Sequence, residues 1–233
     1  MPLEAALARL ARVLRGPDRV GRGPVLAMLA GSNGAGKSTF YAAYLAKLGL
    51  PFVNADVIAA ELRAGSRAAP PQLASLPIDQ AAQRLADEER QASIVLGRSF
   101  VTETVLSDPV GAKVAMLRDA RHRGYQVWLF FIGIGSSALS RARVRERVAA
   151  RAGHDVPDRR IDERYPRTLA NLPGAVAAAS VAVLLDNDLV EQPYRFVALF
   201  QDGQLARRSR LAPRWAAGAL AGAPGQKRRT KRP

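Results

Sequence analysis

Six apolar stretches rich in β-forming residues alternate with helical patterns along the chain. They are VLAMLA at 25–30, PFVNA at 51–55, SFVTET at 99–104, VWLFFIGI at 127–134, VAVLLD at 181–186 and RFVALF at 195–200. This alternation is typical of βαβ units, which build a mostly parallel sheet. The first five stretches are apolar almost throughout, as expected for strands that helices cover on both faces. The pattern therefore predicts one doubly wound α/β domain.

The N-terminal segment has a different periodicity. Leu3, Leu7, Leu10 and Leu14 recur at helical spacing, with arginines between them. An apolar stripe of this kind predicts an amphipathic helix rather than the continuous apolar core of a secretory signal. We assign residues 1–23 to such a helix and expect it to pack on the domain.

The C-terminal segment is strongly basic. Residues 204–233 contain nine Lys or Arg and no acid, and Gly and Pro interrupt them. Such a segment buries too little apolar surface to order itself, so we predict a disordered tail. The string DGQ at 202–204 indicates a hairpin after the sixth strand. The core domain is thus predicted to span residues 24–203.

Composition excludes several classes of protein. The chain has 35 Lys plus Arg against 20 Asp plus Glu, a formal charge of +15 that falls to +6 without the predicted tail. It has no Cys, which excludes disulfides and thiolate chemistry and fits a reducing cytoplasm. The longest apolar run, at 127–133, is far shorter than the roughly 20 residues that span a bilayer, so no transmembrane helix is predicted.

A Gly-rich loop follows the first predicted strand. Its sequence, GSNGAGKS, matches GxxxxGK[ST] in full and leads into helix-forming sequence. Glycines let backbone amides wrap a polyphosphate, Lys37 neutralises the β and γ phosphates, and Ser38 is expected to ligate Mg²⁺. The sequence therefore predicts a nucleoside triphosphate site. Its predicted ATP-binding residues are Gly31, Ser32, Asn33, Gly34, Ala35, Gly36, Lys37, Ser38 and Thr39.

Motor ATPases, GTPase switches and kinases all use such a loop. The loop resembles that of ABC-transporter ATPases, and Asp186 ends an apolar strand as their metal-binding Asp does. However, the chain has no LSGGQ-type signature, and Asn187 stands where those ATPases carry a water-activating Glu. The guanine-binding string NKxD is also missing. These differences favour a kinase.

Six motifs follow one another between residues 24 and 188. They are GSNGAGKSTF, FVNADVIA, SFVTETVLS, RVRERVAARAGHDVP, RRIDERYPRTLANL and LLDND. Their order and spacing resemble the zeta toxin family, P-loop kinases related to UDP-N-acetylglucosamine kinases. The resemblance implies a nucleoside-kinase-like sheet with a helical lid, ATP as donor and a UDP-activated sugar as acceptor. It also makes an antitoxin protein a candidate partner.

Two carboxylates follow the second and third predicted strands, at the sheet edge where doubly wound folds bind ligands. Asp56 can take the proton of an attacking hydroxyl, and it matches the family's catalytic Asp; the alternative is a helix N-cap. Glu103 can hold a metal-bound water or accept a hydrogen bond from substrate; the alternative is a buried acid paired with a core Arg. Thr102, Thr104 and Ser107 are further substrate-contact candidates.

Arginine is dense before the fifth predicted strand. Helical spacing places Arg143 with Arg147 on one face, and Arg160, Arg164 and Arg167 on another. Arginine side chains in cis can stabilise charge on a transferring phosphoryl group, and a helix-turn-helix lid can deliver them. The segment is therefore predicted to form a basic lid.

The resemblance assigns roles within this arginine set. It points to Arg147 and Arg164 as the transition-state clamps, followed by Arg151 and Arg167. On the helix before the third strand it points to Arg84, which can reach the acceptor's diphosphate; a solvated helix charge is the alternative.

Three further residues lead to local expectations. His154 has no second His or Cys at ligand spacing, so no metal site is predicted there. Pro166 lies inside a helical pattern and predicts a kink or break. Asn187, after the fifth strand, is expected near the adenine.

These features together predict an ATP- and Mg²⁺-dependent kinase whose acceptor is a small hydroxyl compound, first of all UDP-N-acetylglucosamine. One alternative is a kinase for another nucleotide or a dinucleotide. The other is a nucleic-acid-binding P-loop NTPase whose basic tail holds DNA or RNA. The charge of the core suits an anionic diphosphate as well as ATP, which leaves only the tail for nucleic acid.

Overall fold

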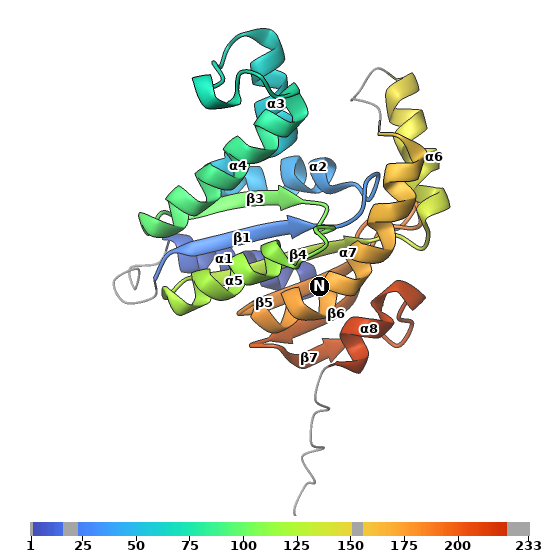
Figure 1. Cartoon of the computed structure of the whole chain (residues 1–233). Helices are drawn as coiled ribbons and strands as arrows, with labels where there is room; N and C mark the ends of the chain where they lie inside the picture. The colour runs from blue at the N-terminus through green and yellow to red at the C-terminus, as the bar shows by residue number, and fades with distance from the viewer. Residues whose placement is uncertain (1, 16–22, 151–155, 223–233) are drawn as a thin grey trace, which may run out of the picture.

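A seven-stranded sheet forms the centre of the protein (Figure 1). The computed structural model describes residues 2–15, 23–150 and 156–222. The strand order is β2-β3-β1-β4-β5-β6-β7. The strands are β1 (Val25–Ala30), β2 (Phe52–Val53), β3 (Phe100–Thr104), β4 (Gln126–Gly133), β5 (Val181–Asp186), β6 (Arg195–Gln201) and β7 (Gln204–Arg208). The first five pair in parallel and the last two are antiparallel, so the predicted doubly wound fold is confirmed.

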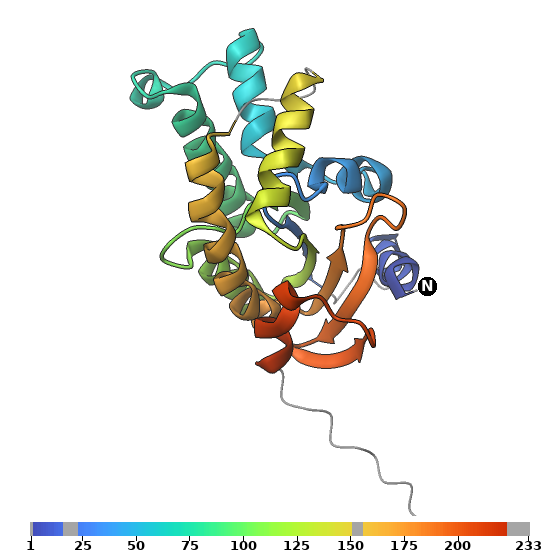
Figure 2. The same cartoon turned by 90° about the vertical axis from the view of Figure 1, so that its right-hand side faces the viewer.

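Helices cover both faces of this sheet (Figure 2). One face carries α1 (Pro2–Arg15) and the continuous helical segment of α2 (Lys37–Phe40), the π-helical turn η2 (Tyr41–Leu45) and the 3-10 turn η3 (Ala46–Leu48). The other elements are α3 (Ala55–Ala64), η4 (Pro71–Leu73), α4 (Ile78–Val95), α5 (Ala112–His122), α6 (Ser137–Ala149), α7 (Asp158–Ala178), η5 (Arg214–Ala216) and α8 (Ala217–Ala221). No helix in the described part of the chain is long and apolar enough to cross a membrane.

Strand β1 shows why apolar and polar residues do not alternate along the apolar stretches. Its residues are all buried, because neighbouring side chains point into different cores. Leu26 and Met28 pack on the face that carries α4, α5 and α7. Ala27 and Leu29 pack on the face that carries α1 and α2. Burial on both faces is what the continuous apolar runs predict.

Helix α1 lies against the sheet, as its leucine spacing predicts. Leu3, Leu10 and Leu14 are buried, and they join the core cluster that includes Trp128 of β4. The guanidinium of Arg9 lies 5.8 Å from the centre of the Trp128 ring, within the range of a cation–π contact. The arginine side of the helix thus also contributes to packing.

The chain is folded beyond residue 204, the position at which the sequence predicts that a disordered tail begins. Residues 204–208 form β7, joined to β6 by a tight turn at Asp202 and Gly203, where φ is 47° and 73°. This confirms the hairpin that the DGQ string indicates and contradicts a tail that starts at residue 204. The remaining predicted tail residues, 223–233, lie outside the described residues.

Trp215 anchors the rest of the C-terminal segment. Only 5% of its surface is exposed, its ring packs beside that of Phe131 with centroids 5.5 Å apart, and its Nε1 donates to Asp186 Oδ1 at 2.9 Å. A side chain at Gly133 would collide with this ring. The tail prediction gave weight to surface arginines and overlooked one large apolar side chain that completes the core.

We expect Trp215→Ala to lower the free energy of unfolding by about 3–5 kcal/mol, because it removes a buried aromatic ring. It also takes one hydrogen bond from the buried carboxylate of Asp186. Urea unfolding monitored by circular dichroism measures the effect. Leu211→Ala is the matched control in the same segment, because that side chain is 74% exposed. Equal unfolding midpoints for the two variants would contradict the anchor.

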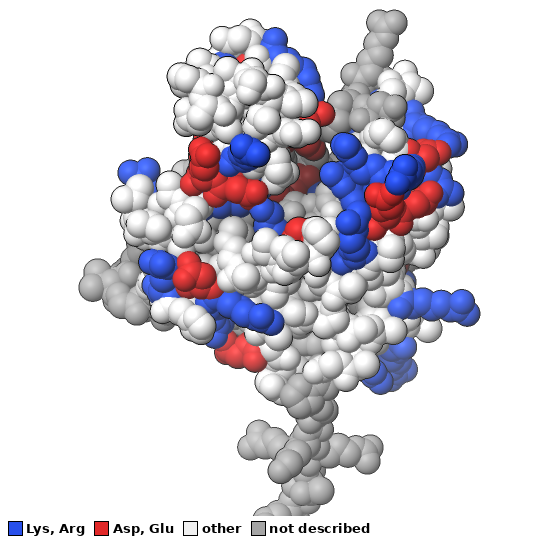
Figure 3. All heavy atoms as spheres, viewed as in Figure 1, with Lys and Arg blue, Asp and Glu red and all other residues white. Residues whose placement is uncertain are grey.

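Two helical hairpins extend beyond the carboxyl edge of the parallel strands. One is made of α3 and α4, and the other of α6 and α7 (Figure 1). Helix α7 is continuous through Pro166 and Pro173, so the predicted break does not occur. Figure 3 shows that the surface is hollowed between the hairpins, with basic side chains gathered on the α6–α7 side. Because doubly wound folds bind ligands at this sheet edge, the hollow is the place to examine for a site.

Candidate functional site

The phosphate loop lies at the floor of the hollow, between β1 and α2. Gly31 and Gly36 have φ of 147° and 91°, which strain any residue with a side chain. A Cβ at Gly31 would lie 2.2 Å from the Ile132 carbonyl oxygen, and one at Gly36 would lie 2.6 Å from Asn187 Nδ2. The two glycines are therefore required for the loop to pass between β4 and the segment after β5.

Lys37 opens α2 and projects into the floor of the site. Its Nζ donates to the Ser32 carbonyl oxygen at 3.0 Å and lies 3.7 Å from Glu103 Oε1. The two charged side chains are 8% and 9% exposed. A lysine that opens a helix and a glutamate of strand β3, 66 positions apart in the sequence, are thus brought into one buried ion pair.

Asn54 connects the two carboxylates that the sequence singles out. Its Nδ2 donates to Glu103 Oε2 at 3.2 Å, and its Oδ1 accepts from the Asp56 backbone N–H at 2.7 Å. Asn54 is therefore the N-cap of α3, and the alternative that Asp56 is the cap is wrong. Asp56 lies in the first helical turn with its side chain exposed to the hollow. The same residue preference that suggested Asp56 as a cap applies to Asn54, two positions earlier.

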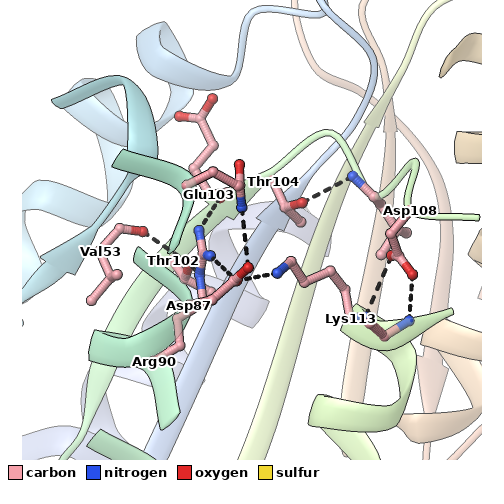
Figure 4. Close-up of polar contacts among 11 residues, drawn as sticks. Val53, Asp87, Arg90, Thr102, Glu103, Thr104, Asp108 and Lys113 are labelled. Carbon is pink, nitrogen blue, oxygen red and sulfur yellow. Dashed lines mark hydrogen bonds and ion pairs between the residues drawn. The ribbon is translucent and has the colours of Figure 1, made fainter. Parts of the chain in front are cut away.

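Glu103 is held in an unusual electrostatic environment. Burial raises the pKa of this carboxyl above its ordinary value, Asp56 raises it further, and the charges of Lys37 and Arg147 act in the opposite direction. The alternative of a core arginine as its ion-pair partner is wrong, because Lys37 is that partner. A core arginine, Arg90, does contact this residue, but at its backbone carbonyl (Figure 4).

This raised pKa gives a pH-dependent stability. The native protein keeps a proton that the unfolded chain has lost, so stability falls as the pH rises from the ordinary carboxyl pKa through the raised one. Glu103→Gln lacks this titration. We therefore expect its free energy of unfolding, relative to wild type, to increase with pH across that interval in urea titrations. A difference that stays constant or decreases with pH would contradict the environment described for Glu103.

The two arginines assigned to the transition state come from different lid helices. The charge of Arg147, on α6, opposes the rise in the pKa of Glu103, and the charge of Asp56 opposes the fall in the pKa of Arg164, on α7. Burial lowers the pKa of Arg164, Arg160 and Arg167 lower it further, and Asp56 opposes them. We call Asp56 and Glu103 the acidic pair. The half-buried guanidiniums of Arg147 and Arg164 thus lie close enough to this pair for the charges to interact, and Lys37 lies beside Glu103.

The structure does not bring every predicted arginine to this centre. Arg143 donates to the Asn187 and Asp188 carbonyl oxygens at 2.6 and 3.0 Å, which ties α6 to the segment after β5. Arg167 Nε donates to the backbone carbonyl oxygen of Glu163. Arg84 is exposed on α4, and no partner for it is found among the described residues.

Two predicted positions lie in the segment that the structure leaves undescribed. Arg151 and His154 both belong to residues 151–155. The two helices that flank this segment are joined by ion pairs, from Arg141 to Asp162 and from Arg145 to Asp158. These pairs hold α6 and α7 together as the lid that the sequence predicts.

The phosphate loop is braced by side chains that the sequence analysis missed. Ser140 Oγ donates to the Asn33 carbonyl oxygen at 2.6 Å, and Tyr194 OH donates to that of Gly36 at 2.9 Å. Asn187, expected near the adenine, uses its Nδ2 to donate to the Ala35 carbonyl oxygen at 2.9 Å. These contacts join residues more than 100 positions apart, which local sequence patterns do not reveal.

Asp186 does not serve as a free metal-binding carboxylate. It is buried at the end of β5, where it accepts from Trp215 Nε1 and, at 2.8 Å, from Arg195 Nη2. Both of its oxygens are therefore engaged with the C-terminal elements. This arrangement agrees with the sequence argument against a motor ATPase.

The site fits a metal that the nucleotide itself helps to hold. Among residues 2–15, 23–150 and 156–222, no group of three His, Asp or Glu side chains could bind a metal. The Ser38 side chain is exposed beside the phosphate loop. Mg²⁺ takes few protein ligands and completes its shell with phosphate oxygens and water, so one hydroxyl at this position is a suitable contribution.

The comparisons with known proteins agree with this geometry. The family model described as Zeta toxin matches residues 10–204. The chain belongs to the zeta toxin family. The resemblance predicted from the six motifs is thereby confirmed, and this family is one of nucleotide-dependent phosphotransferases. Comparison of this zeta toxin family chain with the curated proteins finds no match.

Solved structures share the zeta toxin fold. The AvrRxo1-ORF1:-ORF2 complex with ATP superposes with a TM-score of 0.55 at 18% identity, over 88% of this chain and 66% of that one. The PezAT toxin–antitoxin system of Streptococcus pneumoniae superposes with a TM-score of 0.52 at 17% identity, over 93% of this chain and 84% of that one. At these identities the likeness establishes the fold alone.

Proposed function

We propose that this zeta toxin family member is an ATP- and Mg²⁺-dependent kinase that phosphorylates a hydroxyl of a UDP-activated amino sugar, first of all UDP-N-acetylglucosamine. The observation that carries the proposal is the convergence of charges around one acidic pair. Lys37 contacts Glu103. From the lid, the charge of Arg147 interacts with that of Glu103, and the charge of Arg164 interacts with that of Asp56. A phosphate loop alone supports binding, whereas this arrangement also supports transfer to a second substrate.

Each residue has a defined part in the proposed transfer. Lys37 and the loop amides bind the β and γ phosphates. Asp56 takes the proton of the acceptor hydroxyl while the oxygen of that hydroxyl forms a bond to the γ phosphorus. The bond from that phosphorus to the β–γ bridging oxygen breaks, and ADP leaves. Arg147 and Arg164 stabilise the charge on the equatorial oxygens. When bound through Ser38, Mg²⁺ supplies charge neutralisation of the phosphates.

The proposed acceptor lies between the hairpins, opposite the phosphate loop. Glu103 and Asn54 form a polar wall there that can accept and donate hydrogen bonds to sugar hydroxyls. Thr104 stands next to this wall, although its hydroxyl accepts from the Leu106 backbone N–H at 3.0 Å. Arg84 is available on the α3–α4 side for a diphosphate. An acceptor with hydroxyls at one end and negative charge at the other suits this set.

An antitoxin protein is the proposed macromolecular partner. The PezAT neighbour is described as a toxin–antitoxin system, and a native AvrRxo1 neighbour as an ORF1:ORF2 complex. By analogy, we propose that a small protein binds this chain and controls its activity. Copurification of the chain with the product of an adjacent reading frame would test this partner.

The acceptor is tested with γ-labelled ATP and a panel of UDP-sugars, nucleotides and dinucleotides, followed by mass analysis of each acceptor. We expect label on UDP-N-acetylglucosamine. Label on a nucleotide or dinucleotide instead would support the kinase activity and contradict the proposed acceptor. ATP hydrolysis stimulated by DNA or RNA, and lost when residues 223–233 are deleted, would favour the nucleic-acid-binding alternative.

A further inference from the structure

A buried arginine lies directly behind the acidic pair. Arg90 of α4 is 2% exposed, although it carries a charge that normally stays at the surface. It lies on the apolar face of its helix, one turn after Ala86 and two turns after Ala82, which are also buried. Burial of an unbalanced guanidinium is costly, so its contacts must offset the lost hydration.

Arg90 uses its guanidinium fork to hold strand β3 at two points. Its Nε donates to Thr102 Oγ1 at 2.7 Å, and its Nη2 donates to the Glu103 carbonyl oxygen at 3.2 Å (Figure 4). The third donor, Nη1, reaches Asp87 Oδ1 at 2.7 Å. A planar fork can satisfy three acceptors in fixed directions, which a lysine cannot do.

The hydroxyl of Thr102 extends this contact to the neighbouring strand. Thr102 is fully buried, and its Oγ1 donates to the Val53 carbonyl oxygen at 2.9 Å while it accepts from Arg90. Val53 ends β2, and its next residue is Asn54, the cap of the helix that carries Asp56. One guanidinium is therefore connected to the end of β3, where Glu103 lies, and to the end of β2, just before the helix that carries Asp56.

The charge of Arg90 is compensated from outside the site. Asp87 receives Nη1 and is also contacted by Lys113 of α5. Burial alone would raise the pKa of Asp87, but Lys113 and Arg90 outweigh it and hold the pKa below its ordinary value. The counter-ion of Arg90 is thus the partly exposed carboxylate of Asp87, and the Glu103 carboxylate is paired with Lys37 instead.

We infer that Arg90 is a positioning residue that, through Thr102, holds the ends of β2 and β3 at the spacing that Asp56 and Glu103 need. The inference rests on the proposed kinase function for its catalytic part only. A packed apolar side chain at this position would often stabilise a fold as well as a buried ion pair does. The hydrogen bonds of Arg90 instead reach the end of β3 directly and the end of β2 through the Thr102 hydroxyl, which points to geometry rather than stability as its role.

The test compares Thr102→Val, which keeps shape but removes the hydroxyl, with Thr102→Ser, which keeps it. Arg90→Lys is a second, independent variant that keeps the charge and removes the fork. Arg123→Met is the matched control, because Arg123 forms a surface ion pair with Asp119. Three quantities are measured for each full-length variant: kcat with the acceptor found above, the Kd for ATP, and amide hydrogen exchange.

We expect Thr102→Val and Arg90→Lys to lower kcat by up to about 10²-fold, the effect of a misplacement near 1 Å. The Kd for ATP should not change, and Thr102→Ser should recover most of the lost kcat. Amides of residues 54–56 and 103–105 should exchange faster, whereas those of β4 and β5 should not. Arg123→Met should match wild type in all three quantities.

Other outcomes separate this inference from the proposed function. Unchanged exchange at residues 54–56 and 103–105 in both variants would overturn the inference, whatever the activity. Exchange that increases equally in every strand, or a kcat that falls only in proportion to the folded fraction, would also overturn it. Faster local exchange in variants of a protein that phosphorylates no acceptor would support Arg90 as the positioning residue and contradict the proposed kinase function.

Discussion

Asp56→Asn is expected to lower kcat by about 10²–10⁴-fold, the usual contribution of a general base. The amide cannot take the proton of the acceptor hydroxyl. The Kd for ATP should remain at the wild-type value, because the phosphate loop and Lys37 are unchanged. The helix should also keep its start, since Asn54 is its cap. Steady-state transfer assays and ATP titrations by calorimetry measure these quantities.

Asp79→Asn provides the matched control for this prediction. Asp79 also lies in the first turn of a helix, α4, and its carboxylate forms an exposed ion pair with Arg63. This variant should transfer phosphate at the wild-type rate. If Asp56→Asn did the same, Asp56 would have no place in the mechanism. If Asp56→Asn lost ATP binding and transfer together, its role would be in the nucleotide site.

The double variant Arg147→Ala, Arg164→Ala should lower kcat by about 10³–10⁵-fold, as expected when arginines that neutralise transition-state charge are removed. The Kd for ATP should change far less, since the charge that the arginines stabilise develops mainly during transfer. The losses of kcat in the two single variants should not add up to the loss in the double variant, because both residues interact with the same acidic pair. Single-turnover measurements separate transfer from binding.

Arg159→Ala is the control on helix α7. Arg159 forms an exposed ion pair with Glu163 of the same helix, and it is not among the charges that shift the pKa of Glu103 or Arg164. Its kcat should stay near wild type. An equal loss of ATP affinity and turnover in the Arg147, Arg164 variant would show that the lid binds the nucleotide in its ground state.

The features that the sequence predicts best are those coded by adjacent residues. The phosphate loop is one continuous motif, and the strand that precedes it is an apolar run of six buried residues, so both could be located without a structure. The order of the carboxylates along parallel strands also places them at one edge of the sheet. For Asp56 and Glu103, this was enough to predict that they lie at the edge where such folds bind ligands.

Residues whose roles depend on distant partners were harder to predict. Ser140, Tyr194 and Trp215 each act through a hydrogen bond to a residue at least 29 positions away, which leaves no local signal. Arg90 is different, because its spacing from Ala82 and Ala86 puts a charge on an apolar helix face. That pattern was available from the sequence and indicates a buried charge with a specific partner.

The C-terminal segment is rich in arginine and nevertheless folds onto the domain. Its arginines suggested a tail, yet a disordered segment is defined by too little buried apolar surface rather than by charge alone. Leu205 packs against the core, and Trp215 and Ala219 are buried within it. These apolar side chains, with Ala216 and Leu220, pack the segment onto the domain.

The central claim is that the site transfers phosphate to a small acceptor instead of releasing it to water. The most direct test follows γ-labelled ATP in a mixture of small hydroxyl acceptors and measures the ratio of label transferred to label released as inorganic phosphate, for wild type and Asp56→Asn. We expect most of the label from wild type on one acceptor, and almost none transferred by the variant. Release of inorganic phosphate alone by wild type, at the same rate with and without acceptors, would contradict the claim.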